Sequence, residues 1–205
     1  MRDELANNWT RGSKISTEVL ESLRELNHRF LDLLGAPVGD RRFANCVGLS
    51  METCDRLAPL SADQKSALSA CPYALFDLGL DDAGKWRTRL ESTMRWNVCD
   101  QARAEPSTVE FVRSALFFSW HVAVTSRLTA RLLLGMSEET TGLFRGLTID
   151  CVSALATEAV PVTARWRDCP TYWAALTDGA GRTNAAFLRR VQLSGLQLAA
   201  ATHLT

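Results

Sequence analysis

The sequence predicts a mainly α-helical fold made of two tandem units, each with a helix-turn-helix-like core. The first observation is an internal repeat: a gapless displacement of 87 positions places residues 48–86 on residues 135–173. Eleven of these 39 aligned positions are identical, whereas unrelated sequences would share about two or three. The second observation is that Gly and Pro are few and clustered, which favours helices over a turn-rich β-sandwich.

The identical pairs belong to the segments expected to build the core of each unit. They are Gly48/Gly135, Ser50/Ser137, Glu52/Glu139, Thr53/Thr140, Leu60/Leu147, Asp63/Asp150, Ser66/Ser153, Ala67/Ala154, Leu68/Leu155, Asp81/Asp168 and Trp86/Trp173. None of the six cysteines recurs in this register, so the repeat predicts a shared scaffold with two diverged surfaces.

The first helix is expected to follow a polar N-terminal segment, residues 1–14. Ser16 suits the N-cap position, and apolar residues then recur at a spacing of three and four up to Leu34. Gly35 marks the end of this helix. A further short helical piece is expected over residues 40–47.

Each core should then consist of a short helix, a tight turn and a second helix. In the first unit Ser50 caps a helix over 51–57, and Ser61 caps the next helix and forms a capping box with Gln64. The second unit repeats this order, beginning with a helix over 138–144. There Glu138 and Glu139 are interpreted as first-turn acids that stabilise the helix dipole.

Beyond the cores, residues 73–80 and 160–166 are partly β-like and predict short extended segments. Trp86 and Trp173 follow in further helices, each expected to anchor the core of its own unit. The second unit should open with one uninterrupted helix over 109–134.

A final amphipathic helix is expected over 184–200. The predicted division is therefore a flexible N-terminus at 1–14, a first repeat at 15–105 and a second repeat, with the C-terminal helix, at 106–205.

The overall charge gives no reason to expect strong nucleic-acid binding. The chain has 23 basic and 23 acidic residues, so it lacks the net positive charge typical of such proteins. No apolar run approaches the length of a membrane span, and the N-terminus has no apolar signal-peptide core. These observations predict a cytoplasmic protein without a membrane anchor.

The cysteine and histidine spacing indicates neither a metal site nor a cofactor. The six cysteines form no C-x-x-C pair and the three histidines are scattered. Most of the cysteines are expected to be buried, reduced thiols. His121, on an apolar stretch, is expected to be a core or interface residue, and no histidine is paired with a plausible nucleophile. The sequence therefore predicts a protein that is not an enzyme.

Direct reading of a DNA major groove by the second core helices is disfavoured, because it needs side chains that contact bases and phosphates. Residues 61–70 offer only Gln64 and Lys65, and residues 148–158 contain no basic residue. Packing of two helices across a turn is the simpler interpretation.

Basic residues cluster elsewhere in short groups flanked by acids. A solvated surface is the simpler interpretation, and contact with phosphates or with a partner protein is the functional one. The candidate contact residues are Arg41, Arg42, Lys85, Arg87, Arg89, Arg189 and Arg190.

Several of these patterns resemble the FlhD family of flagellar transcriptional regulators. The first unit is similar to it in Glu25-Leu-Asn27 and in the stretch from Gly48 through Gln64 to Leu68, and the second in residues 134–139 and 147–156. The motifs are helix caps and leucine patterns without a catalytic signature, and the two matches cover about 15–90 and 108–177.

This resemblance implies a helical regulator that dimerises and works with a second subunit. In that family the partner, FlhC, carries the zinc cysteines and much of the DNA contact. A typical member is one unit of about half this length, so two fused units suggest an intramolecular pseudo-dimer. Its main activity would be association with an FlhC-like or other regulator, with DNA contacted only indirectly or weakly.

Two alternatives remain. One is a helical adaptor or effector that acts through protein association and has no role in transcription. The other is a regulator that senses a small molecule, which would combine one basic helix-turn-helix near the N-terminus with a dissimilar remainder.

Overall fold

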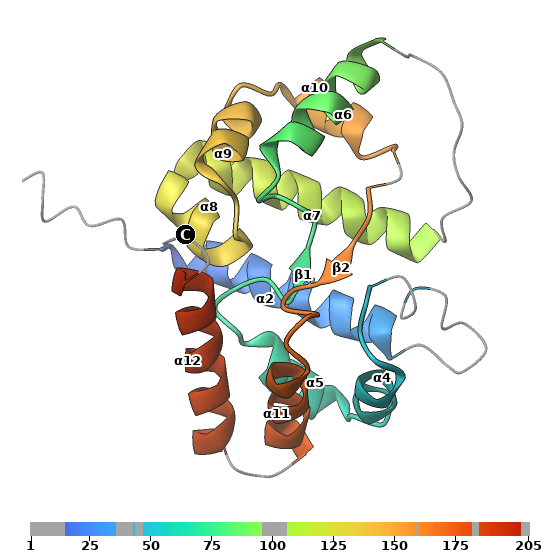
Figure 1. Ribbon diagram of the computed structural model, residues 1–205, viewed down its shortest axis with the longest axis vertical. Helices are drawn as coiled ribbons and strands as arrows, with labels where there is room; N and C mark the ends of the chain where they lie inside the picture. The colour runs from blue at the N-terminus through green and yellow to red at the C-terminus, as the bar shows by residue number, and fades with distance from the viewer. Residues whose placement is uncertain are drawn as a thin grey trace, which may run out of the picture.

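The computed structural model describes residues 15–35, 43, 47–95, 106–158, 160–181 and 185–201 (Figure 1). Within these ranges it is mainly helical with one two-stranded sheet, which confirms the prediction of a mainly α-helical fold. The elements are α2 (Thr17–Leu34), α4 (Met51–Leu57), α5 (Ala62–Ser69), β1 (Phe76–Asp77), α6 (Ala83–Arg95), α7 (Pro106–Thr125), α8 (Arg127–Leu134), α9 (Glu138–Arg145), α10 (Ile149–Leu155), β2 (Thr163–Ala164), α11 (Pro170–Gly181) and α12 (Ala185–Ala201).

Helix α2 begins and ends where the capping residues predict. The Ser16 hydroxyl accepts a hydrogen bond from the Val19 amide, and the Gly35 amide donates to the Leu31 carbonyl. Its inner face carries Leu23 and Phe30, both fully buried, because apolar residues at helical spacing share one face. The expected segments at 1–14 and 40–47 lie outside the described residues, except for Phe43 and Val47 of the second.

The short core helices confirm the predicted caps. The Gln64 amide donates to the Ser61 hydroxyl at 3.3 Å, and the Ser61 amide donates to Gln64 Oε1 at 2.9 Å, so the capping box is complete. Thr148 caps α10, and Ser137 caps α9 with Glu138 and Glu139 in its first turn.

The spacing of the repeat recurs in the positions of the elements. Helices α4 and α5, strand β1 and helix α6 begin at residues 51, 62, 76 and 83. Helices α9 and α10, strand β2 and helix α11 begin at 138, 149, 163 and 170, each 87 residues later. Gly48 and Gly135, which precede these series, both have positive φ angles, of 81° and 69°.

Strands β1 and β2 pair antiparallel near the centre of the molecule (Figure 1). Helices α6, α9 and α10 lie together beyond one end of this pair, and α4, α5 and α11 beyond the other. Helix α6 therefore packs on α9 and α10 rather than on α4 and α5, and α11 packs on α4 and α5.

Two expectations are wrong in detail. The helix expected over 109–134 is interrupted at Ser126, whose extended backbone ends α7 and whose hydroxyl accepts the Thr129 amide to begin α8. A capping serine competes with the helix for the same backbone amides, so the chain turns there. Trp86 was expected in the core of its own unit, but its ring packs edge-on against Phe144 of α9 at a centroid distance of 5.0 Å.

Helix α12 confirms the predicted final helix and is held by a buried tyrosine pair. Tyr73 Oη lies 2.7 Å from Tyr172 Oη and donates to the Gln192 carbonyl at 3.0 Å. A Cβ atom at Gly195 would lie 2.1 Å from Tyr73 Oη, so only glycine permits this approach. Burial raises the pKa of both tyrosines, which therefore stay protonated.

Asn27 of α2 holds the connection between α5 and β1. Its side-chain amide donates to the Ser69, Cys71 and Tyr73 carbonyls, and its oxygen accepts from the Leu75 amide at 2.8 Å. The side chain is fully buried, so it replaces water for four backbone groups that have left solvent.

Candidate functional site

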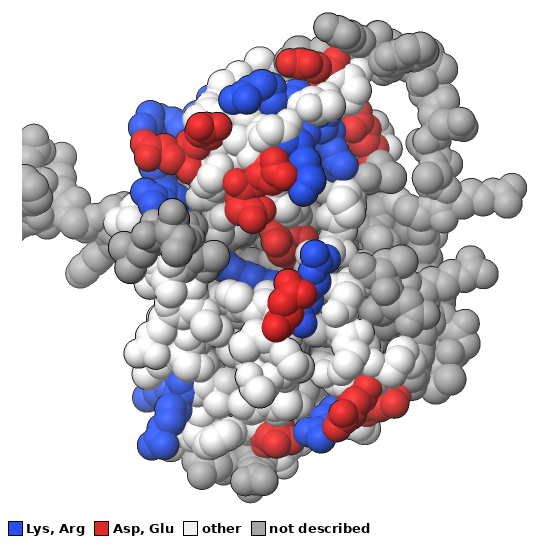
Figure 2. Space-filling model, viewed as in Figure 1, with Lys and Arg blue, Asp and Glu red and all other residues white. Residues whose placement is uncertain are grey.

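The candidate basic residues lie in separate places. Lys85, Arg87 and Arg89 belong to α6, whereas Arg189 and Arg190 are exposed near the start of α12. These two helices lie at opposite ends of the molecule, and Figure 2 shows separate groups of basic side chains in its upper part and at the lower left. Arg41 and Arg42 lie outside the described residues. The structure thus does not bring the five described residues into one patch.

The basic residues of α6 already have acidic or aromatic neighbours. Lys85 Nζ lies 2.8 Å from Asp82 Oδ2, and this partner raises the pKa of Lys85. Arg87 Nη2 lies 3.8 Å from Glu139 Oε2. These ion pairs are exposed, and such pairs contribute little, about 0–1 kcal/mol, so both cations can exchange their partners for a phosphate.

Arg89 has a different environment from its neighbours on α6. Its guanidinium carbon lies 5.5 Å from the centroid of the Trp86 ring. Burial lowers the pKa of Arg89, while the charge of Glu158 acts in the opposite direction. The contact fixes the arginine stem on the buried tryptophan, so Arg89 has a packing role as well as a charge.

The two arginines of α12 differ from those of α6. No ion pair joins Arg189 or Arg190 to an acidic residue in the part of the chain that the structure describes. Arg189 and Arg190 are therefore two adjacent exposed cations without an acidic partner among the described residues.

Helix α5 has few side chains that could contact DNA. Its only basic residue, Lys65, is 16% exposed, and its Nζ atom lies 2.9 Å from Asp32 Oδ1 of α2. Helix α10 has no basic residue and carries Asp150 in its first turn. These surroundings agree with the prediction that neither helix reads a major groove.

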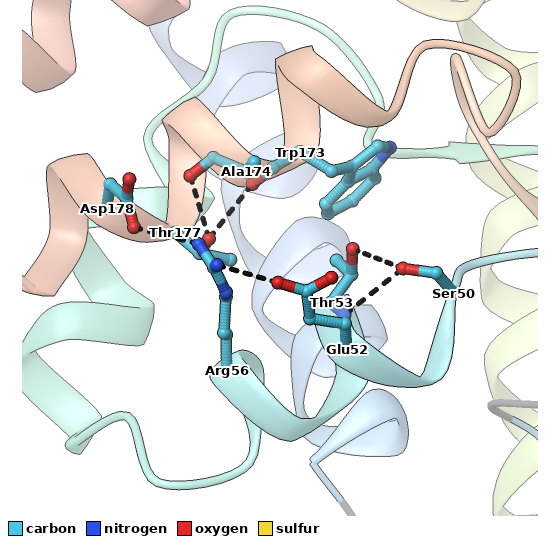
Figure 3. A network of polar contacts seen from close by, with 8 residues as sticks. All are labelled: Ser50, Glu52, Thr53, Arg56, Trp173, Ala174, Thr177 and Asp178. Carbon is cyan, nitrogen blue, oxygen red and sulfur yellow. Dashed lines mark hydrogen bonds and ion pairs between the residues drawn. The ribbon is translucent and has the colours of Figure 1, made fainter.

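A polar network joins the two halves of the chain where α11 packs on α4 (Figure 3). Arg56 of α4 contacts Glu52 of its own helix at 2.8 Å and Asp178 of α11 at 3.2 Å. Behind it, the Thr177 hydroxyl donates to the carbonyls of Trp173 and Ala174. This network satisfies the polar groups of the contact, and nothing in it suggests chemistry on a substrate.

A cavity of about 480 Å³ lies beside the paired strands. Asp77, Asp81, Arg165 and Asp168 contribute charged groups to its lining, together with Ser137 and Trp166. Figure 2 shows a hollow near the middle of this face, bordered by acidic side chains and with basic atoms inside it. Opposite charges thus face one cavity.

The charged groups of this cavity are perturbed by burial. Burial raises the pKa of Asp77, and the nearby Asp81 acts in the same direction, while the Gly79 amide and Arg165 oppose them. Burial lowers the pKa of Arg165, against the influence of Asp77. Arg165 is 8% exposed, and its Nη1 atom donates to the Leu133 carbonyl at 2.8 Å.

Arg165 and Asp77 were not among the predicted site residues, because that prediction relied on charges that cluster along the sequence. Arg165 is a single cation within the β-like stretch 160–166, and a charge in such a stretch is the signal that could have found it. Asp81 and Asp168 were visible as an identical pair in the repeat, and the structure places both at the same cavity.

The remaining expectations concern thiols, metals and membranes. Of the described cysteines, Cys54 and Cys71 are buried, and Cys151 and Cys169 are partly exposed. No group of three His, Cys, Asp or Glu residues in the described ranges is placed to hold a metal ion. Among the same residues, no helix combines the length and apolarity that crossing a membrane requires. His121 is exposed on α7, so of the two expected places, the core or an interface, the core is excluded.

No protein-family model matches this chain, and neither a curated protein nor a solved structure matches it.

Proposed function

We propose that the chain is a non-enzymatic regulator of transcription, cytoplasmic and of FlhD-like type, which acts by association with a DNA-binding partner protein. In this proposal its two halves form an intramolecular pseudo-dimer. The observation that carries the proposal is the reciprocal exchange of α6 and α11, each of which packs on the core helices of the other half.

The register of the strands supports the pseudo-dimer. Phe76 pairs with Ala164 and Asp77 pairs with Thr163. Under the 87-residue displacement Phe76 corresponds to Thr163 and Asp77 to Ala164, so each residue pairs with the counterpart of its neighbour. A twofold axis between two antiparallel strands produces this relation, which is the self-complementary contact of a symmetric dimer.

The charge distribution supports dependence on a partner. Of the second core helices, α5 has one basic residue, Lys65, which is paired with Asp32, and α10 has none. The exposed arginines of α12 are two cations on one helix. Two phosphate contacts give weak and strongly salt-dependent binding, so a second protein would have to supply the specificity. An FlhC-like subunit is the kind of partner that the resemblance implies.

The test is chromatin immunoprecipitation of the tagged full-length chain from its native cells. Enrichment of defined promoter sites, lost when the co-purifying DNA-binding protein is deleted, is the expected result. Purified chain that bound the same sites alone at physiological salt with nanomolar affinity would contradict the dependence on a partner.

The alternative function is a helical adaptor or effector with no role in transcription. The separation of the basic residues on α6 and α12 favours it, because neither group resembles a nucleic-acid surface. Absence of promoter enrichment, together with stable recovery of a partner that does not bind DNA, would replace the first proposal by this one.

A further inference from the structure

The geometry points to a ligand site in the cavity beside β1 and β2, for a small molecule that carries both an ammonium group and a carboxylate. The ligand class is that of the amino acids, and this site goes beyond the proposed regulatory function. The cavity, of about 480 Å³, is within the size range of small-molecule sites.

Arg165 supplies the group that would bind the carboxylate. It is more than nine-tenths buried, and the Leu133 carbonyl is its only hydrogen-bond acceptor among the described residues. Every described side-chain nitrogen or oxygen that is sealed from solvent has a hydrogen-bond partner. The Arg165 nitrogens without an acceptor are therefore not sealed, and they face the open space of the cavity. A guanidinium presents a planar pair of donors that matches a carboxylate.

The position of this guanidinium is set by its neighbours. Its central carbon lies 4.8 Å from the centroid of the Trp166 ring. A Cβ atom at Gly135 would lie 3.0 Å from its Nη2 atom, so the missing side chain leaves room for the arginine. Arg165 is therefore held in place before any ligand arrives, which lowers the entropy lost on binding.

Three carboxylates would bind the ammonium group. Asp77 is the most buried of them, and its Oδ1 atom accepts a hydrogen bond from the Gly79 amide at 2.8 Å. Asp81 and Asp168 are exposed at the same cavity. None of the three forms an ion pair with Arg165 within 4.0 Å. Asp168 Oδ2 lies 3.8 Å from Arg167 Nε, whereas among the described residues no ion pair involves Asp77, Asp81 or Arg165, so both signs of charge remain available there.

This separation of charge selects among ligand classes. A simple anion would meet three carboxylates, and a simple amine would leave the buried guanidinium without an acceptor. A molecule with both groups supplies each side with its counter-charge. Asp77 and Asp81, the two carboxylates of the lining without an ion pair among the described residues, outnumber the single guanidinium, so a basic amino acid should bind more tightly than an acidic one.

The experiment is calorimetric titration of the full-length chain with three probes: L-arginine, agmatine, which lacks the carboxylate, and L-glutamate. L-arginine should bind with a Kd of about 1 mM or lower. Agmatine and L-glutamate should each bind at least about tenfold more weakly, as expected for one lost charge-assisted contact.

Two variants test whether Asp77 contacts the ligand. Asp77→Asn keeps the acceptor for the Gly79 amide and should weaken L-arginine binding about tenfold or more. Asp150→Asn, at an exposed position on α10 outside the cavity lining, is the matched control and should leave the Kd unchanged. Thermal melting of each variant verifies that it is folded.

Three results would overturn the proposal. They are absence of L-arginine binding up to about 10 mM, an unchanged Kd in the folded Asp77→Asn variant, and agmatine binding as tightly as L-arginine. The last result would leave Arg165 without a role in binding a carboxylate.

Discussion

The contact between Gly195 and Tyr73 predicts that the mildest substitution on α12 is strongly destabilising. In Gly195→Ala the new Cβ atom would lie 2.1 Å from Tyr73 Oη and 2.4 Å from its Cζ atom. Such contacts do not persist, so either the tyrosine or α12 must move. The tyrosine is fully buried and packs edge-on against Trp166 at a centroid distance of 4.9 Å.

The magnitude follows from what this movement disrupts. Tyr73 loses its hydrogen bonds to Tyr172 and to the Gln192 carbonyl, worth about 1 kcal/mol each. Overpacking adds about 1–3 kcal/mol, and alanine in place of glycine in a helix returns about 1 kcal/mol. The free energy of unfolding should therefore fall by roughly 2–4 kcal/mol, which for a chain of this size lowers Tm by roughly 4–16 °C.

Urea unfolding and thermal melting followed by circular dichroism measure this change. The matched control is Gly142→Ala on α9, where an added Cβ atom meets nothing within 4 Å. This control should gain about 0.5–1 kcal/mol from helix propensity. In a Tyr73→Leu background Gly195→Ala should be at least ~1 kcal/mol less destabilising, because the opposing atoms are absent. Equal stabilisation by both glycine substitutions would refute the packing of α12 on Tyr73.

Three further predictions follow from other contacts. Asn27→Ala should lower the free energy of unfolding in urea by about 3 kcal/mol or more, because four buried backbone groups lose their partner. Burial raises the pKa of Cys71 from 9.0 to about 11. Between pH 9 and 11 the thiol proton therefore dissociates only in the unfolded state, so the free energy of unfolding should fall as the pH rises. The fall should be steeper than in Cys71→Ala by up to about 1.4 kcal/mol per pH unit. Fragments 1–100 and 101–205 should melt cooperatively only when co-expressed. The first fragment lacks α11, which packs on α4 and α5, and the second lacks α6, which packs on α9 and α10.

The helix boundaries were predictable because their signals are local. A serine or threonine that caps a helix acts on an amide three residues away, and so Ser16, Ser61 and Thr148 could be recognised without knowing the fold. The interruption at Ser126 carries the same signal within an apolar run. There the apolar periodicity outweighed a single capping residue, and the prediction of one continuous helix was wrong.

The charged cavity was not predictable in the same way, because its residues come from separate segments. Asp77 and Arg165 are 88 positions apart, and they approach each other only because β1 and β2 pair. Local patterns instead drew attention to two separate groups of basic residues, one on α6 and one on α12, and these helices lie at opposite ends of the molecule. Clustering along the chain is evidence of a shared site only when the residues also share one element or one edge.

The exchange of α6 and α11 follows from the direction of the two strands. Apolar periodicity specifies which face of a helix is buried, but not which neighbour covers it, and two similar cores offer each helix two similar partners. Strand β1 leaves the group of α4 and α5 and points toward α9 and α10, while the antiparallel β2 points the opposite way (Figure 1). Five residues join β1 to α6, and five join β2 to α11, so each helix begins close to the end of the strand that precedes it. The strand pair at the centre thus directs each following helix into the opposite half, and for this reason we expect the two halves to unfold as one unit.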